Sequence, residues 1–236
     1  MKKLHLLLTA SLFALVSSGQ DQHLVDSLQA ALKIAKQDTV RANILNALFA
    51  NCYYTDPDKA MEYGKQMLQL SEQIGFRKGV GTAYNCIGVV YYIKGDYFLA
   101  LDFYKKSLEI KLELNNKTGA SSTYANIGII YAMQGNFPEA LKNNFSALKL
   151  REETGIKKDI ADSYISLGNI YTLLGNTSEA LKYQLKALPI KKEIGDKLGL
   201  AHSYANIGNI YIDQGNYNEA LVNYLESLKI LEELGD

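Results

Sequence analysis

The stretch YANIGNIYIDQGNYNEALVNYLESLKILEELGD, residues 204–236, decides the fold because its skeleton recurs along the chain. Each copy reads Tyr-x-x-(Ile/Leu)-Gly-x-x-Tyr, then Gly-(Asn/Asp), then Ala-Leu and a Leu-rich run. The copies begin 40 residues apart, at Tyr84, Tyr124, Tyr164 and Tyr204. A constant period of about 20 to 50 residues is typical of an array whose neighbouring units bury each other's apolar faces.

The first half of each copy predicts a helix, which we call helix A. Tyr204, Ile207, Gly208 and Tyr211 follow the spacing i, i+3, i+4, i+7, which places them on one helical face. Gly215 follows as a C-terminal stop, because glycine adopts a left-handed backbone at little cost. Glycine inside a helix costs about 1 kcal/mol relative to alanine, so its recurrence at one helical position predicts close approach of another helix.

The second half predicts helix B, which begins after the cap Asn216, with Glu219 completing a capping-box-like pair. Asn136 with Glu139 and Asn176 with Glu179 repeat this pair in earlier copies. We expect Ala220 to let helix B approach helix A closely, and Leu221, Leu225 and Leu228 to face that same helix A. The preceding B helices are predicted to end at left-handed residues in the same register, namely Gly75, Asn115, Gly155 and Gly195.

This pattern resembles the tetratricopeptide repeat, in the 40-residue class found in kinesin light chains and Leu-Gly-Asn-rich polarity adaptors. SLGNIYTLLGN, residues 166–176, is close to the adaptor style, and the resemblance covers residues 38–236. Asn144 and Gln184 stand where an aromatic residue is usual, whereas Tyr104 and Tyr224 fit. The resemblance implies an all-α, right-handed α-solenoid, or superhelix, of antiparallel helix pairs that serves as a binding surface.

The period also predicts the domain organisation. Residues 20–37 form an N-terminal capping helix, expected over Gln22 to Lys36. Asp38 or Thr39 is expected to cap the first A helix. Five helix pairs follow, in a degenerate repeat over 38–76 and regular repeats over 77–116, 117–156, 157–196 and 197–236.

The first 19 residues predict a signal peptide rather than folded structure. Lys2 and Lys3 precede an apolar run over residues 4–16, and small residues end at Gly19, the expected cleavage site. Such a run gives about 20 Å of helix against a bilayer core of about 30 Å, so it is too short to span. A short anchor helix is the alternative. The prediction is an exported protein, periplasmic or secreted.

Composition favours a folded chain and disfavours nucleic acid as a partner. The chain is 47% hydrophobic, and 25 basic residues balance 25 acidic residues to give zero formal net charge. The sequence therefore lacks the basic surplus that typifies nucleic-acid-binding domains. No membrane span is expected.

No grouping of residues in the sequence supports catalysis, a cofactor or a metal site, so we expect a protein that is not an enzyme. None of the three histidines has a second metal ligand at helical spacing. Cys52 and Cys86 lie on neighbouring A helices at different heights. They are read as two inert buried thiols, with a disulfide as the alternative in an exported protein.

The face of helix A opposite its Tyr-Ile-Gly-Tyr stripe is the predicted binding site. The resemblance implies that A helices line the concave side of the superhelix, and amide side chains there suit an extended peptide backbone. In the alternative reading these residues only solvate the surface. The face contains neither Lys nor Arg, which disfavours a clamp for a C-terminal carboxylate. The candidate groove residues are Asn85, Asn126, Asn169, His202, Asn206, Asn209 and Asp213.

The last B helix carries apolar residues that a following repeat would cover. Ile230 and Leu234 lie about 180° and 220° around from Leu221, by the 100° step of a helix. We therefore expect further repeats, a partner or a second copy of the chain at this end.

Together these features predict an exported scaffold that binds a protein or peptide in its groove. The alternative is the extracytoplasmic sensory segment of a longer signalling protein, either a sensor histidine kinase or a transcription regulator.

Overall fold

The computed structural model describes residues 22–235, and the regular structure within this range is entirely α-helical. The expected signal peptide, residues 1–19, lies outside these residues. A leading helix, α2 (Gln22–Ile34), is followed by five A helices: α3 (Asp38–Cys52), α5 (Arg77–Ile93), α7 (Lys117–Met133), α9 (Lys157–Leu173) and α11 (Lys197–Asp213). These alternate with five B helices: α4 (Pro57–Gln73), α6 (Tyr97–Glu113), α8 (Phe137–Thr154), α10 (Thr177–Glu193) and α12 (Tyr217–Leu234).

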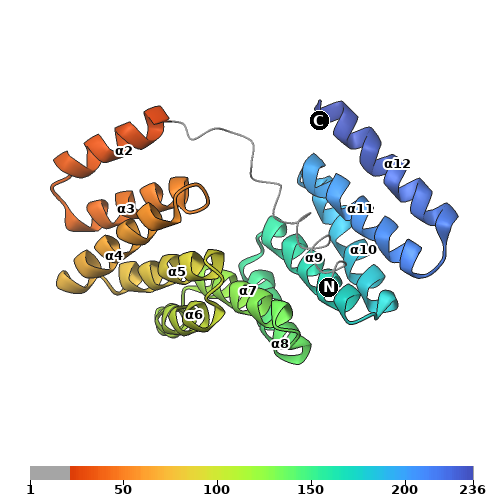
Figure 1. Ribbon diagram of the computed structural model, residues 1–236, viewed down its shortest axis with the longest axis horizontal. Helices are drawn as coiled ribbons and strands as arrows, with labels where there is room; N and C mark the ends of the chain where they lie inside the picture. The colour runs from red at the N-terminus through yellow and green to blue at the C-terminus, as the bar shows by residue number, and fades with distance from the viewer. Residues whose placement is uncertain (1–21, 236) are drawn as a thin grey trace. The chain divides into compact units, whose positions relative to one another are not determined.

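Two structural units divide the helices. In the N-terminal unit, which ends at Gln134, α3 packs on α4 and α5 on α6, and the pairs stack through α4 on α5 and α6 on α7. The leading helix α2 packs on α3. In the C-terminal unit, which begins at Gly135, α8 packs on α9, α9 on α10, α10 on α11 and α11 on α12. The predicted all-α solenoid of helix pairs is therefore confirmed (Figure 1).

Left-handed residues end the helices where the sequence predicts them. Gly95, Gly175 and Gly215 close the A helices with φ of 80°, 74° and 78°. Asn115 has φ of 50° and is the one non-glycine residue with positive φ between residues 22 and 235. It stands where the other B helices have Gly75, Gly155, Gly195 and Gly235.

Glycines inside the A helices lie directly under a B-helix side chain, as predicted. A Cβ atom built on Gly88 would lie 2.7 Å from Tyr104 Cδ1, and one built on Gly208 would lie 2.9 Å from Tyr224 Cε1. At Gly168 the neighbour is Gln184 Nε2, at 2.9 Å. Because real Cβ atoms do not tolerate such distances, the hydrogen of glycine sets the spacing between the paired helices.

Most predicted caps form, but one lacks its side-chain hydrogen bond and one prediction was wrong. Asn136 and Asn176 accept hydrogen bonds from the backbone N–H three residues on. Asn216 is the N-cap of α12, but its Oδ1 accepts no such bond, and its Nδ2 donates to Gln214 Oε1 at 3.4 Å. Asp38 and Thr39 both lie inside α3 rather than capping it. The carboxylate of Asp38 pairs with Arg41 at 3.2 Å.

The leucines of α12 do not face α11, contrary to the prediction. Leu221, Leu225 and Leu228 are 57%, 55% and 51% exposed. Ala220, Tyr224 and Ser227 take the position against α11 instead, with the ring of Tyr224 over Gly208.

Comparison with other B helices shows which face these leucines occupy. Leu101 and Leu108, the equivalents of Leu221 and Leu228 on α6, pack against a cluster that contains Ile127 and Ile130 of α7. Leu221 and Leu228 therefore lie on the face that a following A helix covers. Leu225 matches Leu185, which is also exposed, and lies on the outer side of its helix.

Of the two residues predicted for that face, Leu234 needs correction, whereas Ile230 is partly buried and its equivalent Ile110 is buried. Leu234 is 45% exposed, and its equivalent Leu114, within the array, is 44% exposed. The A helix that follows α6 therefore leaves this position largely exposed, so the predicted cover for Leu234 is wrong. No helix within residues 22–235 is both long and apolar enough to cross a membrane.

Candidate functional site

The predicted groove residues all lie on A helices and are all at least partly exposed. The N-terminal unit holds Asn85 on α5 and Asn126 on α7, and the C-terminal unit holds Asn169 on α9. The other four share α11, where the spacing i, i+4, i+7, i+11 brings them onto one face. They are His202, Asn206, Asn209 and Asp213.

Two of these asparagines also hold their own repeat together. Gln184 Nε2 donates a hydrogen bond of 2.9 Å to Asn169 Oδ1, and Tyr224 Oη donates one of 2.7 Å to Asn209 Oδ1. The donors are the B-helix residues that pack over the A-helix glycine. The Oδ1 atoms of Asn169 and Asn209 are therefore already used to join helices A and B, and this structural bond was not predicted.

Asn126 and Asn206 differ from that pair. Neither side chain makes a hydrogen bond within residues 22–235, and both are partly exposed. An amide offers two donor hydrogens and two acceptor sites, which matches the alternating groups of an extended backbone. These two asparagines are the ones whose full hydrogen-bonding capacity is open to a partner.

Basic side chains of the B helices reach residues of the A helices, a contact that the sequence analysis missed. Lys111, Arg151 and Lys191 occupy the same position of α6, α8 and α10, 40 residues apart. Lys111 is only 7% exposed and Lys191 only 3%. The A-helix face itself contains neither Lys nor Arg, as the sequence shows, but long B-helix side chains extend to A-helix residues such as Asn85 and Asp162. The 40-residue register of these basic residues is the signal that could have found them.

Lys191 has two carboxylate partners. Its Nζ lies 2.6 Å from Asp162 Oδ1 on α9 and 2.8 Å from Asp196 Oδ2, at the N-cap of α11. Burial alone would lower the pKa of Lys191, but the hydrogen bonds to Asp162 and Asp196 raise it above its ordinary value. Asp196 also accepts from Gly199 N–H at 2.9 Å, so one carboxylate caps α11 and neutralises the buried amine.

Arg151 is held by neutral groups. Its Nη1 donates to the backbone carbonyl of Asp159 at 3.1 Å and to Ser163 Oγ at 2.8 Å, both on α9. Its Nε is buried without a hydrogen-bond partner among the described residues.

Lys111 lies among polar groups that carry no charge. Its Nζ donates to Thr123 Oγ1 at 2.7 Å and to Asn85 Oδ1 at 3.3 Å, so it joins the candidate residue Asn85 to α7. Burial lowers the pKa of Lys111 to about 8. At pH 7 its amine remains protonated.

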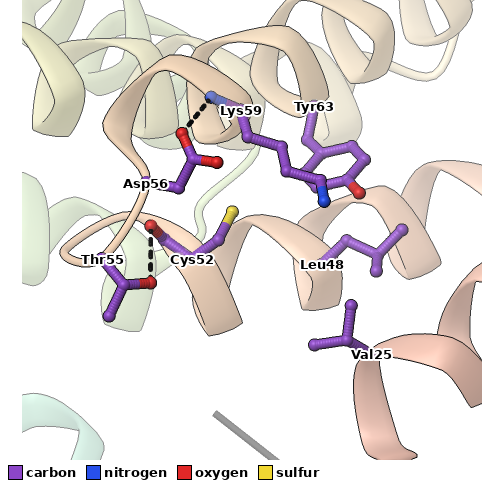
Figure 2. Close-up of a pocket in the computed structure, with 7 residues that line it drawn as sticks. All are labelled: Val25, Leu48, Cys52, Thr55, Asp56, Lys59 and Tyr63. Carbon is purple, nitrogen blue, oxygen red and sulfur yellow. Dashed lines mark hydrogen bonds between the residues drawn. The ribbon is translucent and has the colours of Figure 1, made fainter. Parts of the chain in front are cut away.

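A small cavity lies beside α2, α3 and α4 in the N-terminal unit, and Figure 2 shows its lining. Its volume is about 260 Å³, below the range of about 300–1,000 Å³ typical of small-molecule sites. Asp56 Oδ1 accepts from Lys59 N–H and caps α4, so this carboxylate has a structural role. The cavity is lined by Val25, Leu48, Cys52, Thr55, Asp56, Lys59 and Tyr63.

The cysteines carry no reactive thiol. Cys52 and Cys86 are free and buried, in agreement with the reading of two separate thiols. Burial raises the pKa of the Cys52 thiol to about 11 and that of Cys86 to about 12, so neither is a thiolate at neutral pH. Within residues 22–235, no three His, Cys, Asp or Glu side chains gather in a way that could hold a metal ion.

Comparison with protein families identifies the repeat. A family model described as Tetratricopeptide repeat matches residues 79–153 and 159–233, more than half of the chain. The chain belongs to the tetratricopeptide repeat family. A search of curated proteins finds no match.

Several solved structures share the fold of this tetratricopeptide repeat protein. BtubC (BKLC) from P. vanneervenii is 17% identical, with a TM-score of 0.80 over 92% of this chain and 93% of its own. Kinesin light chain TPR-like repeats from Podosopora anserina are 13% identical, with a TM-score of 0.67 over 85% and 99%. A Rap protein complexed with Competence and Sporulation Factor is 16% identical, with a TM-score of 0.71 over 89% and 70%. At these identities the likeness shows the fold alone.

Proposed function

We propose that this tetratricopeptide repeat protein is an exported scaffold that binds a protein or peptide along the exposed face of its A helices. The observation that supports this most directly is the polar row of α11, where His202, Asn206, Asn209 and Asp213 share one partly exposed face. Such a row can pair with the backbone of an extended segment. The Rap protein in complex with Competence and Sporulation Factor gives a precedent for an array of this fold holding a partner.

Isolation of the partner and substitution of the free amides test the binding site. Proteins that co-purify with the chain from the periplasm are identified by mass spectrometry, and the affinity of the main partner is then measured. Asn126→Ala with Asn206→Ala should weaken binding and leave the helical circular dichroism unchanged. Asn169 and Asn209 are kept, because their loss would also remove bonds between helices A and B.

Lys142→Ala with Lys182→Ala is the matched control, because both lysines are exposed on B helices. If the asparagine pair and the lysine pair change the affinity equally, the A-helix face is not the binding site.

Export is tested by locating the protein and sequencing its mature N-terminus. We expect a periplasmic or secreted protein that begins at Gln20, and a change of Leu8→Arg within residues 4–16 should hold it in the cytoplasm. A protein that stays in the cytoplasm without this change would reject export. A reading frame that continues into an apolar stretch of about 20 residues would favour the sensory segment of a longer protein instead.

A further inference from the structure

One exposed position of the B helices differs in character between the two structural units. It holds Lys65 on α4 and Lys105 on α6, but Phe145 on α8 and Leu185 on α10. Both lysines are exposed, and Phe145 and Leu185 are 39% and 47% exposed. The C-terminal unit therefore presents apolar side chains to solvent where the N-terminal unit presents lysines.

Aromatic contacts join Phe145 to the neighbouring helices. Its ring lies edge-on to that of Tyr183 on α10, with the centroids 6.2 Å apart. Tyr183 stacks on Tyr171 of α9 at 5.5 Å and lies 6.2 Å from Tyr164 of the same helix. Because Tyr164 and Tyr171 belong to the stripe opposite the groove candidate Asn169, this aromatic cluster is separate from the candidate groove.

Two lysines of α10 lie over these rings, and only one of them has a carboxylate partner. Lys182 Nζ lies 5.6 Å from the centroid of Tyr183 and 2.9 Å from Glu179 Oε2. Lys186 Nζ lies 5.5 Å from the centroid of Tyr183 and 5.3 Å from that of Tyr164. No carboxylate of residues 22–235 pairs with Lys186. Since like charges four residues apart on a helix repel each other, Lys182 makes the position of Lys186 less favourable still.

The corresponding lysine of α6 shows what Lys186 lacks. Lys106 Nζ lies 5.1 Å from the centroid of Phe103, the aromatic residue at the same position of its repeat. Lys106 also forms an ion pair of 2.7 Å with Asp102, four residues earlier. The residue four positions before Lys186 is Lys182. A lysine thus covers an aromatic ring in both repeats, but only α6 supplies a carboxylate to it.

Lys149 is a second lysine without a partner, next to Phe145. It follows Phe145 by four residues on α8, the spacing of neighbours on one helical face, and it is exposed. It forms no ion pair within residues 22–235, and Glu109 stands at its place on α6. The carboxylate of Glu152 accepts a hydrogen bond of 3.4 Å from Tyr164 Oη. An exposed apolar side chain between two unbalanced lysines complements a segment whose carboxylates flank an apolar residue.

We propose that the B helices of the C-terminal unit carry a second binding surface, which takes an acidic segment of a partner protein. Its members are Phe145, Lys149, Leu185 and Lys186. An apolar side chain of the segment packs on Phe145 or Leu185, and its Asp or Glu side chains pair with Lys149 and Lys186. The partner thereby supplies the carboxylate that α6 has at Asp102. This surface goes beyond the binding site proposed on the A helices and does not depend on it.

Short peptides test the surface without knowledge of the partner. The acetylated and amidated peptide EELEE is titrated into the ¹⁵N-labelled protein at pH 7, and the backbone amide resonances are followed by NMR. We expect saturable shifts at Phe145, Lys149 and Lys186, and none at the matched residues Lys105 and Lys106. The peptides QQLQQ and EESEE, which lack the charge or the apolar side chain, should bind more weakly. Equal shifts on α6 and α10, or equal binding by either control peptide, overturn the proposal.

Substitutions place the binding on particular side chains. Lys182→Asp gives Lys186 the intrahelical carboxylate that Lys106 has, and it should weaken EELEE binding about two- to fivefold, the effect expected of an exposed charge pair. Phe145→Lys copies the residue of α6 and should also weaken binding. Lys106→Gln is the matched control and should leave the affinity unchanged. All three positions are at least partly exposed in the wild type or on α6, and circular dichroism checks the fold. Equal affinities of Lys182→Asp and Lys106→Gln for EELEE overturn the proposal.

Two further comparisons exclude other binding modes. Asn126→Ala with Asn206→Ala, the change that tests the A-helix site, should leave EELEE binding unchanged. A loss of EELEE binding in that variant places the peptide on the A helices and overturns the second surface. Vesicles of phosphatidylglycerol are compared with vesicles of phosphatidylcholine, because an anionic lipid surface also attracts lysines. Binding to phosphatidylglycerol that is lost in Phe145→Lys, without binding of EELEE, overturns the assignment to a protein segment.

Discussion

The missing Cβ atoms of Gly88, Gly168 and Gly208 determine how closely the two helices of a repeat approach each other. Each glycine is covered by the residue 16 positions later, an aromatic ring twice and Gln184 once. The helix tolerates the roughly 1 kcal/mol cost of an interior glycine because the covering side chain then packs against its backbone. Gln184 fills the aromatic position with a hydrogen bond to Asn169.

Gly168→Leu should lower the free energy of unfolding by about 1–3 kcal/mol or more, because its side chain would collide with the fully buried Gln184. Chemical denaturation followed by circular dichroism measures the change. Adding Gln184→Ala should recover part of the loss by opening space. An unchanged stability in the single variant would mean that the close approach does not require glycine.

Lys111 should give the protein a characteristic pH dependence. Its pKa is lowered from 10.5 to about 8 in the folded state, so between these values the unfolded chain binds the proton more strongly. Stability should therefore rise as the pH rises from 8 toward 10, at up to about 1.4 kcal/mol per pH unit relative to Lys111→Met. Denaturation midpoints of both proteins across this range measure it. Parallel pH profiles for the two proteins would show that Lys111 is not desolvated.

At the scale of single elements, the helix ends follow from local rules. A cap bond and a left-handed residue involve neighbours in the chain, so sequence alone predicts Asn136, Asn176 and Asn115 correctly. Asn216 shows the limit of these rules. The same residue type in the same register turns its Nδ2 to Gln214 Oε1, and its Oδ1 accepts no backbone N–H, since other local partners compete with the cap for the orientation of one short side chain.

The two capping asparagines provide a direct comparison. Asn176→Ala should cost about 1 kcal/mol of stability, because Glu179 N–H loses its acceptor at the start of α10. Asn216→Ala at the start of α12 should cost clearly less, since no cap bond is lost. Thermal unfolding of both variants measures the two losses of stability. Equal losses would mean that Asn216 caps its helix in solution.

The orientation of B helices could not be predicted from the sequence in the same way. A B helix is apolar on two sides, one facing its own helix A and one facing the next, and angular spacing alone does not tell them apart. Leu221 and Leu228 were therefore assigned to the wrong side. The buried lysines were missed for a related reason. Charged residues are usually exposed, and only the acceptors on two other helices explain why Lys111 and Lys191 are not.

For the candidate site, sequence predicted the helices and the exposure of the seven groove residues. It did not predict that Asn85, Asn169 and Asn209 already accept hydrogen bonds from within the protein. Those bonds depend on residues 15 to 26 positions later on a packed B helix, a separation at which no local pattern reports a contact.

At the scale of the whole molecule, a polypeptide prepared as residues 20–236 exposes the leucines of α12, and these should drive its association. We expect self-association that increases with protein concentration, because Leu221 and Leu228 reproduce the apolar face that α6 uses against α7. Sedimentation of the wild type should show it, and Leu221→Gln with Leu228→Gln should yield a monomer. Leu225→Gln is the control, because that position is exposed elsewhere in the array. If all three proteins sediment alike as monomers, this face does not associate.

The recurring face of the B helices also bears on how such a chain changes over evolutionary time. Because α12 carries, at Leu221 and Leu228, the same apolar face that α6 packs against α7 with Leu101 and Leu108, a duplicated repeat should find a matching surface on either B helix. Deletion of one repeat should likewise leave two repeats whose apolar faces match. The number of repeats can therefore change while the packing between neighbouring repeats stays the same. What then distinguishes one repeat from another is the set of partners around its buried basic residue, which are carboxylates at Lys191 and neutral groups at Lys111.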